Sequence, residues 1–397
     1  MGLSGLGREG EGGDGVRVLV NAASVKEGGP RVVLDQLLQR MHRQRDDIDW
    51  VFAVHPNVPL QWTERRNLTR LDASNIDSSP FGVLRWYEAA LPAAVKLLKV
   101  DLVFSITNYL PWRRLTIPAV LLVQHAGHFS DRFDVLIRKN LRRPDRIAAW
   151  KMKMRWVERS VRTATEVTVQ TASLADAIAT RTRRPRAHIH TIPHGPGTVT
   201  PTLVSRTNLT GRPVRIGYIT KWGVQKNFDV LFGAVARLIG QGRAVRLILT
   251  LSEDFPENLL VLQRAKHAGL GDVLENVGEI DARRISTLYD SLDIFAFPSL
   301  VESFGFPLVE GMAKGLPIVP ADTPSNREIA GDAGLFFPPV DAAALAGILA
   351  ELIDNSALRK AKSEAGLRRA QAFSWNRAAE STLALFDTAL GTGANST

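Results

Sequence analysis

The chain has 397 residues, of which 45% are apolar and 23% are charged, with a formal net charge of +10 and no cysteine. This length accommodates two domains with ample cores, and the composition is that of a soluble globular protein. The absence of cysteine excludes disulfides, thiol nucleophiles and cysteine metal sites, and no apolar run approaches the ~18 residues that span a bilayer.

The N-terminal stretch, residues 1–15, is rich in glycine and charge, and we expect a disordered tail without the apolar region of a secretory signal. The apolar run 16–21 predicts the first strand, and the periodicity of 31–44 predicts a helix. Gly28 and Gly29 lie between them, where glycine permits close backbone approach to a ligand. A plain turn between strand and helix is the alternative.

Two more predicted strands, 101–106 and 120–124, each lead into a loop at the carboxyl end. The second of these loops carries His125 and His128. Histidine at this place can hydrogen-bond hydroxyl groups or transfer a proton, although a lone histidine is more often structural.

The densest positive charge lies in the stretch 138–162, which we expect to be a basic helix with ten Lys or Arg residues against two acids. Tryptophan and methionine residues alternate with these charges. The pattern suits an anionic membrane surface and could also bind nucleic acid. A solvated helix face with its apolar side chains toward the core is the alternative.

Residues 196–212 are rich in Pro, Gly and Thr, as expected of an interdomain linker. They divide the chain into a first domain over 16–195 and a second domain over 213–373. Strands and helices alternate in both, which predicts two parallel, doubly wound sheets facing a cleft.

The second domain begins with a predicted strand over 214–220, and the loop after it carries Lys221 and Lys226. Two cations five positions apart in such a loop can hold a diphosphate group. Solvated loop charges are the alternative for either lysine.

The stretch 293–320 has the pattern of a strand, a loop, a helix and a second strand. Pro307 suits the first turn of the helix, and Gly315 is a signal for its end. The loop lies at the carboxyl end of the first strand, where open α/β sheets bind ligands.

Glu302 lies in this loop and Glu310 lies one turn into the helix. Gly305 lets the backbone approach a ligand, and the N–H groups of Gly305 to Leu308 are expected to form an anion site at the helix start. Carboxylates on either side can accept hydrogen bonds from hydroxyl groups. The pattern therefore predicts a pocket for a ligand with both a phosphate and a polyol.

The segment Glu302-Ser-Phe-Gly-Phe-Pro-Leu-Val-Glu310 resembles the E-x7-E signature of retaining, nucleotide-sugar-dependent glycosyltransferases of family 4, the glycosyl transferases group 1. This resemblance implies the GT-B fold, with two Rossmann-like domains facing a cleft and the helix over 374–390 crossing back to the first domain. The resemblance is strong over 293–337, fair over 214–231 and weak before residue 190.

By this resemblance, Lys221 and Lys226 take the place of the Arg and Lys that stabilise the donor diphosphate in the family. Lys221 exchanges a bidentate guanidinium for a point charge. Glu302 would hold a sugar hydroxyl and Glu310 the ribose diol. The histidine of the family aligns ambiguously here, and we favour His125 over His128.

The candidate catalytic residues are Lys221, Lys226, Glu302 and His125. The expected donor-binding residues are Gly28, Gly29, Glu279, Ile280, Ser303, Phe304, Gly305, Phe306, Pro307, Leu308 and Glu310.

The resemblance implies a retaining transfer of a sugar from a GDP- or UDP-sugar to the hydroxyl of a carbohydrate or lipid-linked acceptor, in bacterial surface polysaccharide or glycolipid synthesis. No metal and no other cofactor is expected. We expect a cytoplasmic protein that contacts the anionic inner face of the plasma membrane through 138–162, and no nucleic acid partner. A non-catalytic sugar- or nucleic-acid-binding protein on a GT-B fold is the alternative.

Overall fold

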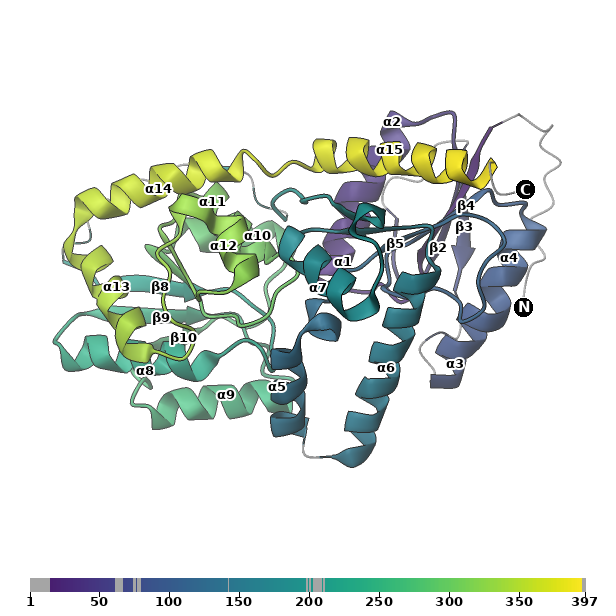
Figure 1. Cartoon of the computed structure of the whole chain (residues 1–397). Helices are drawn as coiled ribbons and strands as arrows, with labels where there is room; N and C mark the ends of the chain where they lie inside the picture. Colours follow the sequence, from purple (N-terminus) through teal and green to yellow (C-terminus); the bar gives the residue numbers. More distant parts are fainter. Residues whose placement is uncertain are drawn as a thin grey trace.

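A computed structural model describes residues 15–394 except 61–66, 74–75, 77–79, 142, 198, 200, 203–208 and 210. The expected tail at 1–15 falls outside this part of the chain apart from Gly15, as does much of the expected linker at 196–212. The described chain forms two parallel β-sheets with helices around each (Figure 1).

The first sheet has seven strands in the order β3-β2-β1-β4-β5-β6-β7, and all its pairings are parallel. Its central strands are buried along nearly their whole length because helices cover both faces. The strands are β1 (Arg17–Ala22), β2 (Asp49–Val54), β3 (Leu68–Asp72), β4 (Leu102–Ser105), β5 (Ala119–Leu122), β6 (Glu166–Val169) and β7 (Ile189–Thr191).

Helices connect these strands, and two of the helices contain a wider turn in the middle, at Leu34–Leu38 and at Trp86–Ala90. The helices are α1 (Gly28–Val33), α2 (Gln39–Gln44), α3 (Pro80–Arg85), α4 (Leu91–Leu97), α5 (Asp131–Leu141), α6 (Pro144–Thr163) and α7 (Ala172–Thr182), with short turns at Ala126–Phe129 and Arg186–His188.

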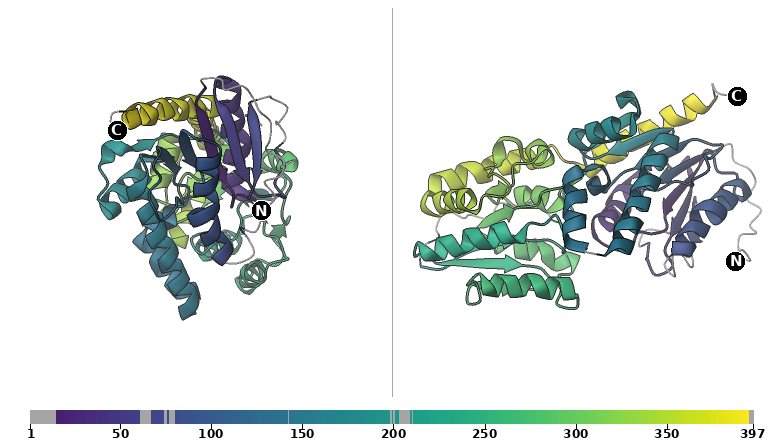
Figure 2. Two further views of the ribbon diagram at one scale, coloured as in Figure 1. Left: turned by 90° about the vertical axis from the view of Figure 1, so that its right-hand side faces the viewer. Right: turned by 60° about the horizontal axis from the view of Figure 1, so that its bottom comes forward.

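The basic stretch 138–162 was expected to be one helix, and this prediction is wrong. The stretch comprises the end of α5 and most of α6. Pro144 occupies the first turn of α6, where proline is favoured, so a new helix begins there. The two helices form a hairpin that projects from the body of the protein (Figures 1 and 2).

The second sheet has five parallel strands in the order β10-β9-β8-β11-β12. The strands are β8 (Val214–Tyr218), β9 (Val245–Leu249), β10 (Leu274–Asn276), β11 (Ile294–Phe297) and β12 (Ile318–Pro320). Around it lie α8 (Phe228–Gly240), α9 (Pro256–His267), α10 (Ala282–Asp290), α11 (Phe306–Ala313), α12 (Pro324–Ala330), a turn at Gly331–Ala333, α13 (Ala342–Asp354) and α14 (Ser356–Ala370).

The last helix, α15 (Trp375–Ala394), leaves the second sheet and packs on the first (Figure 1). Phe386 is fully buried there, with its ring centroid 5.1 Å from that of Phe104 and 6.4 Å from that of Trp50. Arg45 of the first half pairs with Asp387 at 3.0 Å. The expected crossing of the C-terminal helix back to the first domain is confirmed.

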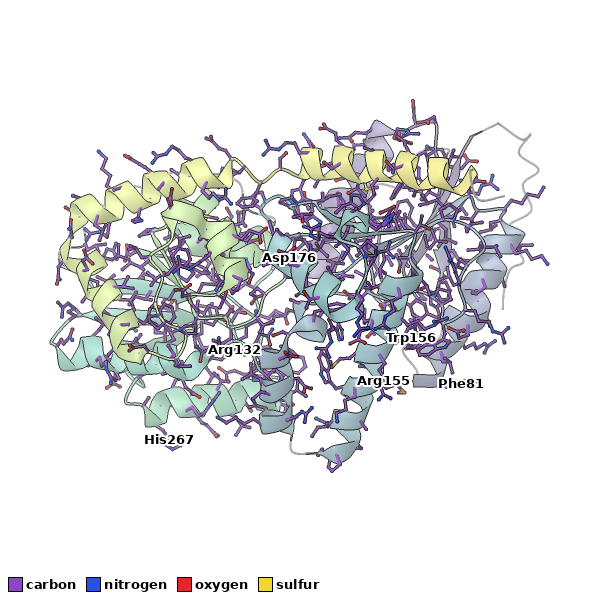
Figure 3. The ribbon with its side chains drawn as sticks, viewed as in Figure 1. Phe81, Arg132, Arg155, Trp156, Asp176 and His267 are labelled. Carbon is purple, nitrogen blue, oxygen red and sulfur yellow. The ribbon has the colours of Figure 1, made fainter. Side chains whose placement is uncertain are left out.

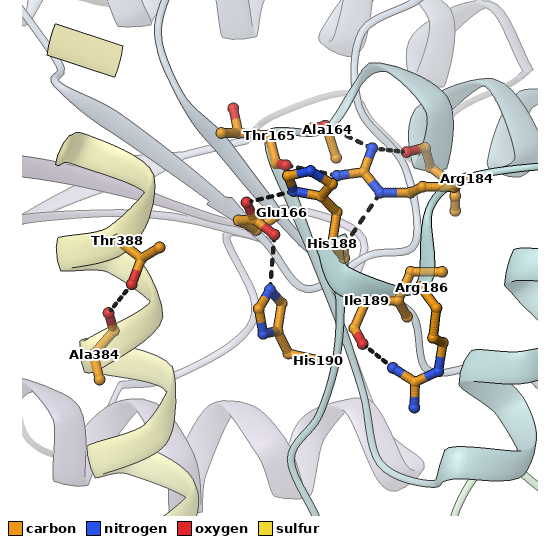
Figure 4. Close-up of polar contacts among 11 residues, drawn as sticks. Ala164, Thr165, Glu166, Arg184, Arg186, His188, Ile189, His190, Ala384 and Thr388 are labelled. Atoms are coloured by element: carbon orange, nitrogen blue, oxygen red, sulfur yellow. Dashed lines mark hydrogen bonds and ion pairs between the residues drawn. The ribbon is translucent and has the colours of Figure 1, made fainter. Parts of the chain in front are cut away.

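The edge strand β7 is tied to its neighbour by a buried carboxylate (Figure 4). Glu166 of β6 contacts His188 Nδ1 at 2.9 Å and His190 Nε2 at 2.7 Å. Both carboxylate oxygens therefore have a hydrogen-bonding partner, as buried polar groups generally do. A cavity of about 570 Å³ lies beside it, between β7 and α15.

Candidate active site

The centre of the candidate site is an ion pair between two loops of the second sheet. Lys226 Nζ lies 2.6 Å from Glu302 Oε1, and each side chain is only 14% exposed. Lys226 follows β8 and Glu302 follows β11, and these strands are direct neighbours in the sheet. Because parallel strands end at the same edge, residues 76 positions apart in the chain are brought together.

Glu310 lies on α11 and is almost completely buried. The Tyr289 hydroxyl donates to Glu310 Oε2 at 2.7 Å. A Cβ atom added to Gly197 would lie 1.9 Å from Glu310 Oε1, so a larger residue at this position would displace the carboxylate. Burial, followed by the negative charge of Glu310, raises the pKa of Tyr289 well above its ordinary value, which keeps the phenol as a donor.

Lys221 joins the two halves of the protein across the candidate site. Its ammonium lies 2.6 Å from Glu27, in the loop after β1, and 2.7 Å from Glu279. Burial alone would lower the pKa of Lys221, but hydrogen bonds to these two carboxylates raise it above its ordinary value. Lys221 is therefore charged, and a diphosphate that binds it would compete with Glu27 and Glu279 for the same cation.

The Gly-rich loop of the first half faces the start of α11. Gly28 has a φ of +69°, a conformation that favours glycine, and begins α1. A Cβ atom on Gly29 would lie 3.5 Å from the ring of Phe306, so this loop and α11 are in close contact. A cavity of about 560 Å³ opens beside the loop and is lined by residues 24–27 and Pro30.

The histidine loop after β5 contacts the loop that carries Glu302. The Ser303 hydroxyl donates to the carbonyl oxygen of Gln124 at 2.7 Å, directly before His125. Burial lowers the pKa of His125, while the nearby Glu302 carboxylate raises it and Lys226 lowers it. His125 therefore lies within electrostatic reach of the Lys226–Glu302 pair and stays neutral near pH 7.

His128 lies next to His125, with ring centroids 4.7 Å apart. Its ring stacks on Trp150 of α6, with centroids 4.7 Å apart and planes at 14°. Burial and the proximity of His125 lower the pKa of His128 to about 2. His125 Nδ1, His128 Nδ1 and Trp150 Nε1 are buried, and no hydrogen-bond partner for them occurs among the described residues. The choice of His125 over His128 stays a prediction.

The expected anion site at the start of α11 is smaller than the sequence analysis proposed. Pro307 has no N–H group, and the Leu308 N–H donates to the carbonyl oxygen of Gly305 at 2.9 Å. Only the amides of Gly305 and Phe306 remain for a phosphate. Gly305 has a φ of +78° and forms the cap of the helix.

Of the remaining expected donor-binding residues, Phe304 and Leu308 have side chains in the core of the second half, so only their backbone can contact a ligand. Glu279 is exposed and Ile280 is half-buried, next to Lys221. Glu27 and Tyr289 were not among the residues expected from the sequence. Glu27 directly precedes the glycine pair, which was the one signal for it, whereas nothing in the local sequence marks Tyr289.

No group of three or more His, Asp or Glu side chains that could hold a metal ion occurs within the described residues. In the same part of the chain, no helix is long and apolar enough to cross a bilayer.

Residues 203–369 match the family model described as glycosyl transferases group 1. Among curated proteins, the chain is 29% identical over 170 residues to the MMP alpha-(1->4)-mannosyltransferase of Mycolicibacterium hassiacum. This match covers 42% of this chain and 40% of that protein. The chain is 31% identical over 133 residues to the phosphatidyl-myo-inositol mannosyltransferase of Mycobacterium leprae, covering 33% of this chain and 36% of that one. The chain thus matches less than half the length of these relatives.

Among solved structures, the chain is similar to Anabaena Alr3699/HepE in complex with UDP-glucose, with a TM-score of 0.69 and 18% identity over 94% of this chain and 99% of that chain. This likeness and the two parallel sheets identify the fold as GT-B. The match over residues 203–369 agrees with the resemblance to the glycosyl transferases group 1 seen in the sequence, and the expected GT-B fold is confirmed.

Proposed function

Because residues 203–369 are a glycosyl transferases group 1 domain within a GT-B fold, we propose that this chain transfers a sugar from a nucleoside diphosphate sugar to an acceptor hydroxyl, with retention of the anomeric configuration. The observation that carries the proposal is the Lys226–Glu302 ion pair at the carboxyl ends of β8 and β11. It places a cation for phosphate beside an acceptor for sugar hydroxyl groups, both largely shielded from water.

In this mechanism the diphosphate leaving group gains charge in the transition state. Lys226 and Lys221 stabilise that charge, together with the two amides at the start of α11. Cations and amides thereby take the part that a metal ion plays in other phosphate sites, and the transfer proceeds without one. Glu302 accepts a hydrogen bond from a donor sugar hydroxyl, and Glu310 accepts from the ribose.

His125 is neutral and lies near Glu302, so it serves as a hydrogen-bonding group toward the transferred sugar. The departing phosphate takes the proton of the acceptor hydroxyl on the same face of the sugar. Correct positioning of donor and acceptor then supplies much of the rate enhancement.

A thermal-shift panel of UDP-, GDP- and ADP-sugars tests the proposal, since a bound donor stabilises the folded state by mass action. Relatives named as mannosyltransferases place the nucleoside diphosphate mannoses first in the panel. The donor that raises Tm is then incubated with acceptors, and NMR reports the configuration of the product. Inversion contradicts the proposed stereochemistry, and binding without turnover would identify a non-catalytic binder.

We also propose that the α5–α6 hairpin contacts an anionic membrane surface, in keeping with a lipid-linked acceptor at the inner face of the plasma membrane. Arg132 on α5 and Arg155 on α6 mark its two arms in Figure 3. Lys151 and Arg155 are exposed on α6 without an ion-pair partner in the described chain, and Met152 beside them is 64% exposed. Exposed cations next to an exposed apolar side chain favour binding to anionic lipid headgroups.

Vesicle sedimentation tests this contact. The double variant Lys151→Glu/Arg155→Glu should lose most of its binding to vesicles that contain about 30 mol% anionic lipid. Each cation near such a surface contributes about 1 kcal/mol to binding. The matched control, Lys360→Glu/Arg368→Glu, reverses two exposed cations on α14 and should bind like the unaltered chain. Equal losses in the two variants would show a nonspecific effect of net charge.

A further inference from the structure

A carboxylate of the second half caps a helix of the first half. Glu328, on α12, accepts hydrogen bonds from the backbone N–H groups of Ala172 and Ser173, at 2.5 and 2.9 Å. These residues begin α7, so Glu328 satisfies two amides that have no partner within the helix. Figure 1 shows α12 and α7 facing each other where the two halves of the protein meet.

The two hydrogen bonds of this cap are stronger than neutral ones, because a carboxylate accepts them at the positive end of the helix dipole. Charge-assisted hydrogen bonds of this kind are about twice as strong as neutral ones. Thr171 already provides the local cap of α7 by accepting from the Leu174 amide. Glu328 therefore adds a second cap that exists only while the two halves are in contact.

The helix that carries Glu328 is itself held firmly. Asn326 donates to the carbonyl oxygens of Ser299 and Ala321, and Arg369 donates to the carbonyl oxygen of Glu328. The side chain thus extends from a rigid support, as a residue that fixes geometry should.

The capped helix connects directly to the candidate active site. The Thr171 hydroxyl donates to the carbonyl oxygen of Ser303 at 3.0 Å, and the Ser303 hydroxyl donates to that of Gln124 at 2.7 Å. Ser303 directly follows Glu302, and Gln124 directly precedes His125. These two hydrogen bonds connect the start of α7 with the Glu302 loop, and the Glu302 loop with the histidine loop.

We propose that Glu328 is a positioning residue, which holds the Glu302 loop over His125 by capping α7 across the boundary between the two halves. It touches neither donor nor acceptor and acts through Thr171 and Ser303. Its kinetic consequence rests on the proposed glycosyl transfer, whereas the capping contact does not. Donor binding depends mainly on Lys226 and Glu310 of the second half, so loss of the cap should affect turnover more than donor affinity.

The test compares Glu328→Gln with Glu351→Gln, an exposed glutamate on α13 in the same half. In Glu328→Gln one amide keeps an acceptor while the other meets an NH₂ group. Hydrogen exchange at the amides of Ala172 and Ser173 should become about tenfold faster, because exchange reports local opening. Glu351→Gln should leave it unchanged.

With the donor found in the panel, Glu328→Gln should lower kcat about tenfold and change the Kd of the nucleotide less than twofold. If Glu328 had only a structural role, its substitution would change Tm and hydrogen exchange throughout the chain. It would not lower kcat while leaving the nucleotide Kd nearly unchanged. Unchanged exchange at Ala172 and Ser173 overturns the cap, and faster exchange with unchanged kcat overturns the positioning role. A wild-type chain without any transfer would refute the proposed function, while the exchange measurement would still decide the cap.

Discussion

Replacement of Lys226 by methionine tests the centre of the site, because methionine is of similar length and carries no charge. In the wild type the ammonium lies 2.6 Å from Glu302, and 14% of each side chain is exposed. The substitution removes the proposed contact with the diphosphate and leaves Glu302 without its cation. We therefore expect losses in both turnover and stability.

The two losses have different magnitudes. Two unit charges at 2.6 Å attract by about 6 kcal/mol at an effective dielectric constant of ~20, before desolvation is subtracted. Removal of one partner from a buried pair costs about 3–5 kcal/mol, and the remaining exposure places this pair near about 3 kcal/mol. Loss of one preorganised group that stabilises transition-state charge lowers kcat about 10²–10³-fold.

The double variant Lys226→Met/Glu302→Gln separates the two effects. It removes both charges, so its free energy of unfolding in urea should recover by about 2 kcal/mol relative to Lys226→Met. Its kcat should stay as low as that of the single variant or fall further. Recovery of turnover together with stability would show that Lys226 acts only as a structural partner and would refute its proposed catalytic role.

Three further predictions concern Glu310, His194 and Gly195. Glu310→Gln should weaken binding of the nucleoside diphosphate about tenfold or more by calorimetry, because a charged hydrogen-bond acceptor for the ribose is lost; a 2′,3′-dideoxy nucleotide should bind both proteins equally. Burial lowers the pKa of His194 to about 3. The unfolded chain therefore binds a proton at this residue below its ordinary pKa of about 6.5, whereas the folded chain does not until about pH 3. The free energy of unfolding thus decreases as the pH is lowered from about 6.5 to 3. His194→Leu should lose about 2 kcal/mol less than the wild type between pH 7 and 5 in urea titrations; equal losses would contradict this. In Gly195→Ala the new Cβ would lie 2.4 Å from Trp375, so Tm should fall by an amount that corresponds to about 1–3 kcal/mol, whereas Gly240→Ala, with nothing within 4 Å, should be neutral.

Much of the fold followed from local patterns in the sequence. The stretch 293–320 forms the predicted strand, loop, helix and strand, and Gly315 has a φ of +61° at the end of α11 as a helix stop requires. The strand β3 was missed because Leu68–Asp72 is a half-exposed strand at the edge of the sheet and lacks an apolar run. The hairpin of α5 and α6 was read as one helix although Pro144 marked the break.

The candidate site residues could be proposed from the sequence where a motif, or a loop at the carboxyl end of a predicted strand, contains them. Glu302 and Glu310 share a motif, and Lys226 follows a strand whose neighbour in the sheet leads to Glu302. Glu27 and Glu328 contact residues 194 and about 155 positions away, across the boundary between the two halves. Such contacts depend on how two separately folded sheets meet, and no periodicity or spacing in the sequence records that arrangement.

The most direct test of the account is a crystal structure of the chain with the nucleotide sugar that gives the largest thermal shift. The account predicts the diphosphate against Lys226 and the Gly305 and Phe306 amides, a sugar hydroxyl on Glu302 and the ribose on Glu310. A donor found elsewhere, for example in the cavity between β7 and α15, would contradict it.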